Sequence, residues 1–269
     1  MIPTRLPILM LAGLSLASPL LADVKSGHAT AGLVAGLSSF RPGKAVPVAI
    51  RLTMDPGWHS YWINPGESGV PLKAVWTLPE GWKAGELRQP LPKRFTTGGL
   101  AGFGYEGEAL FLVDLIPPAT AAGDARCQVK LSWLTCNDSS CVPGKAELEL
   151  TLPAGEGKPS PEAALVAAAA ERLPRPIEGL ALEVEDQGKT LRLSLRGPAD
   201  FDPSASEVFV ATPQTVDPAE RPVFARDGAA WTAVVRKNEY AEGPAALVEL
   251  VLAGGKISKP TSVLWRSAK

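Results

Sequence analysis

Two cysteines stand between two alternating runs of apolar and polar residues, and this arrangement constrains the fold more than any other feature of the sequence. Cys136 and Cys141 are separated by Asn137–Ser140, four residues that favour turns. Residues 126–133 and 145–152, on either side, both alternate between apolar and polar. Strict alternation is typical of half-buried strands. We therefore predict one β-hairpin whose turn brings the two cysteines within disulfide range.

The cysteine pair could have a structural or a chemical role. A disulfide between Cys136 and Cys141 would close a very small ring, which the chain-entropy relation credits with only about 2 kcal/mol of stabilisation. This is modest support for a chain of 269 residues, so a chemical role has to be considered. The third cysteine, Cys127, shares the inward face of its strand with Val129 and Leu131. We predict a buried, inert thiol there, with a redox or metal role as the alternative.

Composition favours an all-β protein and excludes several function classes. Gly and Pro number 26 each and punctuate short runs rich in Val, Leu and Thr, while long helical patterns are nearly absent. The net charge is −1 with no basic block, which argues against a nucleic-acid partner. The sequence has no His/Cys cluster with zinc-site spacing, no phosphate-binding glycine loop and no nucleophile elbow. We expect no metal and no cofactor.

The first 22 residues predict export. Arg5 precedes an apolar run from Leu6 to Leu16, and the segment ends at Ala22 before Asp23. This pattern is typical of a secretory signal peptide cleaved after Ala22. An uncleaved anchor is the alternative, but the apolar run is short for a spanning helix of about 20 residues. No later stretch of the sequence is long and apolar enough to span a membrane, so we predict an exported mature chain in which a disulfide can persist.

An aromatic strand precedes the predicted hairpin. Turn signals bracket the sequence WHSYW at residues 58–62, where both tryptophans share one face and His59 and Tyr61 share the other. We interpret this segment as a core strand with the tryptophans packed inward. The alternative is a surface aromatic patch near the cysteine turn, where His59 could contact a partner.

A glycine-rich segment follows this strand. Residues 89–105 are predicted to form a loop that presents Phe103 and Tyr105 and that could lie over a reactive site. Trp133, which lies close to the cysteine pair in the sequence, is a further candidate for contact with a partner.

Residues 154–177 form a linker with the one convincing helix of the mature chain. Ser160 suits the N-cap and Pro161 the first helical position of a helix that is predicted to run to about Leu173. Strand-like runs return over residues 178–269, which we predict to be a second small β domain without chemistry of its own. Its expected role is to dock onto the first domain or onto a partner.

Three sequence motifs occur in order along the first part of the chain. They are GWHSYWINPGESG at residues 57–69, GYEG at 104–107, and WLTC at 133–136 followed by CVP at 141–143. Together they resemble the periplasmic amino-terminal domain of the DsbD family, and most closely its ScsB-like branch. The resemblance covers roughly residues 24–153 and, more loosely, the linker helix and the β region after it. It implies an immunoglobulin-like β-sandwich in the periplasm.

The resemblance also implies a function in thiol:disulfide interchange, with Cys136 and Cys141 as the redox pair. Electrons would pass from a thioredoxin-like domain or a membrane electron-conduit protein to periplasmic disulfide proteins, although the reverse direction stays open. The loop with Phe103 and Tyr105 would take the place of the family's cap loop. Family members usually continue into a membrane-embedded conduit and a thioredoxin-like domain. This sequence ends at Lys269 without them, so a separate protein is expected to supply the reductant.

Two other functions compete with disulfide exchange. The first is a non-catalytic secreted β-sandwich that binds a partner and holds a structural disulfide. The second is copper tolerance, because Cys136, Cys141, His59 and Met54 are soft or borderline metal ligands, although they are scattered along the sequence.

For disulfide exchange we expect thiols that are not strongly acidic, since Asp138 in the turn would raise a thiol pKa.

Overall fold

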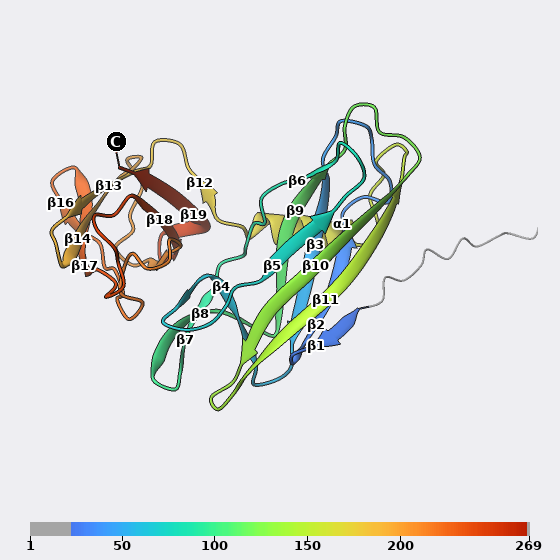
Figure 1. Ribbon diagram of the computed structural model, residues 1–269. Coiled ribbons are helices and arrows are strands. Elements are labelled where there is room, and N and C mark those ends of the chain that lie inside the picture. The colour runs from blue at the N-terminus through green and yellow to red at the C-terminus, as the bar shows by residue number, and fades with distance from the viewer. Residues whose placement is uncertain (1–22, 268–269) are drawn as a thin grey trace, which may run out of the picture.

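The computed structural model describes residues 23–267, and strands dominate this part of the chain. The signal peptide predicted for residues 1–22 lies outside the described residues. The strands form two pairs of sheets, which Figure 1 shows as two lobes; we call them the N-lobe, residues 24–153, and the C-lobe, residues 175–266. The predicted all-β, immunoglobulin-like fold with one short helix is confirmed. Over residues 23–267, no helix combines the length and the apolar character needed to cross a bilayer.

Two antiparallel sheets form the N-lobe. The first has the order β1-β2-β3-β9-β6; its strands are β1 (Val24–Ser26), β2 (Ala29–Ala35), β3 (Val46–Met54), β9 (Glu108–Ile116) and β6 (Lys83–Ala84). The second has the order β11-β10-β4-β8-β7, and β5 also pairs with β10; its strands are β11 (Cys141–Pro153), β10 (Asp124–Cys136), β4 (His59–Gly66), β8 (Leu100–Glu106), β7 (Lys93–Thr97) and β5 (Lys73–Thr77).

The core of the N-lobe lies between these two sheets. The predicted alternation of β10 is confirmed, because Cys127, Val129, Leu131 and Trp133 are buried while the residues between them are exposed. β11 alternates in the same way opposite β10. Burial of every second side chain is the physical reason why these two sequences form strands rather than helices.

The one helix among residues 23–267, α1 (Ala163–Glu171), covers the outside of the first sheet. Its buried Val166 and Ala169 belong to a small apolar cluster with Val34 of β2 and Leu112 of β9. This helix begins two residues later than predicted. Glu162, not Ser160, is the residue before the first helical turn. The Ser160 hydroxyl donates a hydrogen bond of 2.5 Å to the carbonyl of Ala35 and accepts one of 3.1 Å from the backbone N–H of Glu162.

The segment predicted to be a loop, residues 89–105, instead forms most of a β-hairpin. β7 and β8 pair along their length, with Phe95 opposite Gly102 and Thr97 opposite Leu100. Residues 89–92 lie outside the strands, and the hairpin turns at Gly98 and Gly99, where both glycines have positive φ angles. β7 is therefore the edge strand of the second N-lobe sheet.

The C-lobe contains two four-stranded sheets. One has the order β12-β19-β18-β15; its strands are β12 (Arg175–Pro176), β19 (Ile257–Arg266), β18 (Leu247–Gly254) and β15 (Glu207–Val210). The other has the order β13-β14-β17-β16; its strands are β13 (Ala181–Asp186), β14 (Thr190–Arg196), β17 (Ala230–Arg236) and β16 (Ala225–Asp227). Most of its buried residues form a core of their own, but Phe209, Ala211 and Val251 belong to the core of the N-lobe.

Candidate functional site

The candidate site is the disulfide at the tip of the β10–β11 hairpin. Cys136 and Cys141 lie directly opposite each other, with an S–S distance of 2.04 Å and a Cα–Cα distance of 4.1 Å. The side-chain oxygen of Asn137 accepts hydrogen bonds from the backbone N–H groups of Ser139 and Ser140, at 2.9 and 2.8 Å. The predicted hairpin, its tight turn and the approach of the two cysteines are confirmed.

The two sulfur-bearing residues differ sharply in exposure. Cys136 is 0% exposed, whereas Cys141 lies at the surface. Cys136 also stands in register with His59 of β4, and His59 stands in register with Glu106 of β8. Residues directly opposite each other in a sheet place their side chains on the same face. The disulfide, His59 and Glu106 therefore form one row across four strands, on a face of the sheet that we call the disulfide face.

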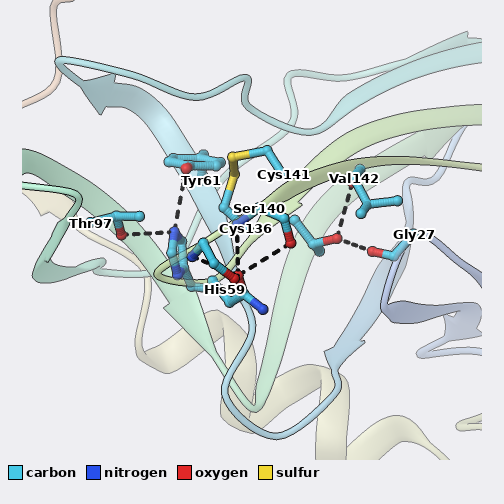
Figure 2. The surroundings of a disulfide bond; sticks show 11 residues. Gly27, His59, Tyr61, Thr97, Cys136, Ser140, Cys141 and Val142 are labelled. Atoms are coloured by element: carbon cyan, nitrogen blue, oxygen red, sulfur yellow. Dashed lines mark hydrogen bonds between the residues drawn. A yellow bond between two sulfur atoms is a disulfide. The ribbon is translucent and has the colours of Figure 1, made fainter.

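Aromatic side chains bury the Cys136 end of this row. The ring of Phe95, from β7, lies 4.1 Å from the His59 ring and 5.8 Å from the Tyr61 ring, measured between centroids. Nε2 of His59 lies 3.3 Å from the Tyr61 hydroxyl and 3.5 Å from the Thr97 hydroxyl. Figure 2 shows His59, Tyr61 and Thr97 grouped beside the disulfide. We call Phe95, His59 and Tyr61 the aromatic cover.

Burial shifts the pKa values of the two titratable residues in the aromatic cover, His59 and Tyr61. Burial lowers the pKa of His59, and the nearby carboxylates of Glu106 and Asp138 oppose this effect only in part. Burial also raises the pKa of Tyr61. Both effects favour the neutral side chain. Burial therefore favours uncharged side chains at His59, which stands in register with Cys136, and at Tyr61.

The two aromatic residues predicted to cover the disulfide lie elsewhere. Phe103 and Tyr105 are buried on the opposite face of β8, where Phe103 packs against Phe209 and Tyr105 packs against Phe111, at centroid distances of 6.0 and 5.3 Å. Their burial prevents them from covering the cysteines. Phe95 of β7 instead packs against His59, which stands in register with Cys136.

Sequence reasoning missed Phe95, although Gly102 carries a signal for it. A Cβ atom at Gly102 would lie 2.3 Å from the Phe95 ring, so only glycine permits this packing. Trp133, proposed as a partner contact, is 3% exposed and packs over Gly144 in the interior. Of the proposed contact residues, only His59 lies beside the disulfide.

The remaining candidates for chemistry are buried in the core. Cys127 is 0% exposed, and burial raises its pKa to about 11, so its thiol stays protonated at neutral pH. Met54, which was considered as a copper ligand, is 4% exposed within the N-lobe core. Within residues 23–267, His, Cys, Asp and Glu side chains do not gather in any group of three or more that could hold a metal ion.

Comparisons with known proteins agree with this architecture. Residues 32–153 match the family described as "Thiol:disulfide interchange protein DsbD, N-terminal". The crystal structure of the N-terminal periplasmic domain of ScsB from Proteus mirabilis matches with a TM-score of 0.64 and 20% sequence identity, over 89% of this chain and 93% of that one. At 20% sequence identity, this structural similarity is evidence for the fold alone. None of the curated proteins matches the chain significantly. The resemblance inferred from the three motifs is confirmed.

Proposed function

Residues 32–153 of this chain match the family of DsbD N-terminal domains, and from this match we propose that the protein exchanges disulfides with partner proteins through Cys136 and Cys141. The unequal burial of the two cysteines supports this proposal most directly. Cys141 offers a sulfur to a partner, while Cys136 is closed off by the sheet and the aromatic cover.

The exchange would proceed through a mixed disulfide. A thiolate of the reducing partner attacks Sγ of Cys141, a new bond forms between these two sulfurs, and Sγ of Cys136 leaves with the electron pair. A second thiol of the partner then attacks the partner's own sulfur and releases Cys141. The sum transfers two electrons and two protons to the pair. Reduction of a substrate disulfide would run the same steps in reverse, with Cys141 as nucleophile and Cys136 as the resolving thiol.

The family and the fold suggest where this chemistry takes place. The proposed site is the periplasm, with a thioredoxin-like domain or a membrane electron-conduit protein as the donor and periplasmic disulfide proteins as acceptors. We expect thiols without a strongly lowered pKa, because the turn contributes the carboxylate of Asp138 and no cation. Control of reactivity would then come from access to the sulfur atoms.

Single-cysteine variants test the proposal. In Cys136→Ser the exposed Cys141 cannot be resolved, so we expect mixed disulfides with partner proteins to accumulate in periplasmic extracts. In Cys141→Ser the buried Cys136 should form almost none. Cys127→Ala is the matched control and should exchange like the wild type, because Cys127 lies in the core on the other face of β10.

The reduction potential of the pair separates exchange from a structural role. We expect a value above roughly −300 mV, the range of proteins whose disulfides are made and broken. A lower potential, together with the absence of trapped partners for Cys136→Ser, would contradict the proposal. The chain would then be a binding module with a structural disulfide.

A further inference from the structure

The C-lobe contacts the N-lobe through β15, the edge strand of its sheet. Edge strands carry backbone groups without strand partners, and two N-lobe side chains bind those of β15. Nδ2 of Asn64 donates a hydrogen bond of 2.8 Å to the carbonyl of Val210, and Nη2 of Arg94 donates to the carbonyl of Val208. Both donors come from the sheet that carries the disulfide, Asn64 from β4 and Arg94 from β7.

Arg94 makes the larger set of contacts. Its guanidinium lies between two rings, 4.8 Å from the centroid of Phe103 in the N-lobe and 5.0 Å from that of Phe209 in the C-lobe. Nη1 donates a further hydrogen bond of 3.2 Å to the carbonyl of Glu220, and Nε lies 3.4 Å from the carboxylate of Glu207. The side chain is only 12% exposed. Removing the partners of a buried charge is costly, so these contacts favour the observed arrangement of the two lobes. A lysine could not replace Arg94 here, because only the planar guanidinium can stack on the rings and donate from several nitrogens at once.

The strand that carries Arg94 also carries Phe95. Successive side chains of a strand point to opposite faces, so Arg94 reaches into the C-lobe while Phe95 packs on His59 and Tyr61 over the disulfide face. β7 pairs only with β8, on one side. Side-chain contacts also join β7 to its own sheet, from Lys93 to Glu106 and from Thr97 to His59. Arg94 is the residue of β7 that joins this strand to the C-lobe.

We propose that Arg94 is a positioning residue through which the C-lobe holds Phe95 in the aromatic cover. This inference rests on the proposed function and assigns the C-lobe a part in it: control of the rate at which the disulfide opens. When Arg94 is released, β7 and Phe95 move away from His59 more often. Water then reaches Sγ of Cys136, which stabilises the thiolate that leaves as Cys141 is attacked.

The test measures reduction of the Cys136–Cys141 disulfide by dithiothreitol, with acid quenching and alkylation. Arg94→Met keeps an apolar stem and removes the charge and the donors. We expect reduction about tenfold faster than in the wild type, which corresponds to about 1.4 kcal/mol. Phe95→Ala should give a similar increase. The double variant should be no faster than Phe95→Ala alone, because Arg94 acts through Phe95.

Arg126→Met is the matched control, since Arg126 lies on β10 with its side chain 69% exposed and should leave the rate unchanged. If Arg94→Met fails to fold, Arg94→Lys keeps the charge without the planar fork and should give a smaller increase. A wild-type rate in folded Arg94 variants, or full additivity with Phe95→Ala, would overturn the inference. Dithiothreitol requires no protein partner, so this result is independent of whether Cys136→Ser traps one.

Discussion

At the scale of single residues, His59 is the titratable group closest in register to the disulfide. It faces Cys136 from β4, with Glu106 on β8, Asp138 in the hairpin turn and the hydroxyls of Tyr61 and Thr97 around it. Burial outweighs the two carboxylates and lowers the pKa of His59. The folded protein thus binds a proton at His59 less readily than the unfolded chain does.

This difference predicts that stability depends on pH. As the pH falls below about 6.5, the unfolded chain takes up a proton at His59 before the folded protein does, so the free energy of unfolding decreases. His59→Gln removes the titrating group, and its urea unfolding should depend less on pH between about pH 7 and pH 5. His28→Gln, at the only other histidine, is the control and should retain the wild-type dependence on His59. Equal pH dependence in the wild type and His59→Gln would contradict this prediction.

At the scale of elements, the hairpin turn brings the two cysteines together. The side-chain oxygen of Asn137 accepts hydrogen bonds from two backbone N–H groups and from both serine hydroxyls of the turn. The backbone N–H of Asn137 also donates to the carbonyl of Ser140, at 2.9 Å. These contacts favour the geometry that the oxidised pair requires.

Asn137→Ala should therefore make the disulfide easier to reduce. Loss of the side-chain acceptor loosens the turn most in the reduced protein, where no covalent bond holds the cysteines together. A loss of about 1 kcal/mol corresponds to a potential higher by about 20 mV, measured by equilibration with a thiol buffer. Ser139→Ala removes one exposed hydroxyl and leaves the backbone bonds, so its potential should stay close to that of the wild type. An unchanged reduction potential in Asn137→Ala would mean that strand pairing along the β10–β11 hairpin determines the geometry of the two cysteines without the Asn137 contacts.

The β10–β11 and β7–β8 hairpins show which parts of the fold the sequence could predict and which it could not. β10 and β11 were predicted correctly because one face of each is buried and the other exposed, which leaves a clear alternation. The β7–β8 hairpin was missed because glycines in β8 appear as loop residues. Gly104 serves close packing instead, since a Cβ atom there would lie 1.8 Å from the carbonyl oxygen of Ser60. A single sequence does not distinguish a glycine that permits close packing within a strand from a glycine that permits a turn.

The candidate site was predictable in its covalent part and not in its surroundings. Cys136 and Cys141 follow from local spacing. The assignment of His59 and Tyr61 to one face of β4 also follows from alternation, and Trp62 is buried as the core-strand interpretation predicted. His59 stands in register with Cys136 but is buried, so the residues do not form a surface patch. β4 is buried on both faces, because Trp62 packs toward Phe209 of the C-lobe. Contacts between segments this distant in sequence leave no periodic signal.

At the scale of the whole molecule, the two lobes share part of one core through Phe209. This residue is fully buried, and its ring lies 6.0 Å from the rings of both Trp62 and Phe103. Truncation of a buried phenylalanine lowers the free energy of unfolding by about 3–5 kcal/mol. For Phe209 we expect this loss to weaken the contact between the two lobes, because its ring packs on Trp62 and Phe103 of the N-lobe. We expect wild-type protein to unfold in one urea transition, and Phe209→Ala to unfold in two, each with a smaller m-value than that of the wild type because less surface is exposed in each step. Val223→Ala, at a C-lobe residue that is 71% exposed, should unfold like the wild type. A single transition with an unchanged m-value in Phe209→Ala would show that the lobes are coupled without this ring, and Arg94 and Asn64 would then carry the connection.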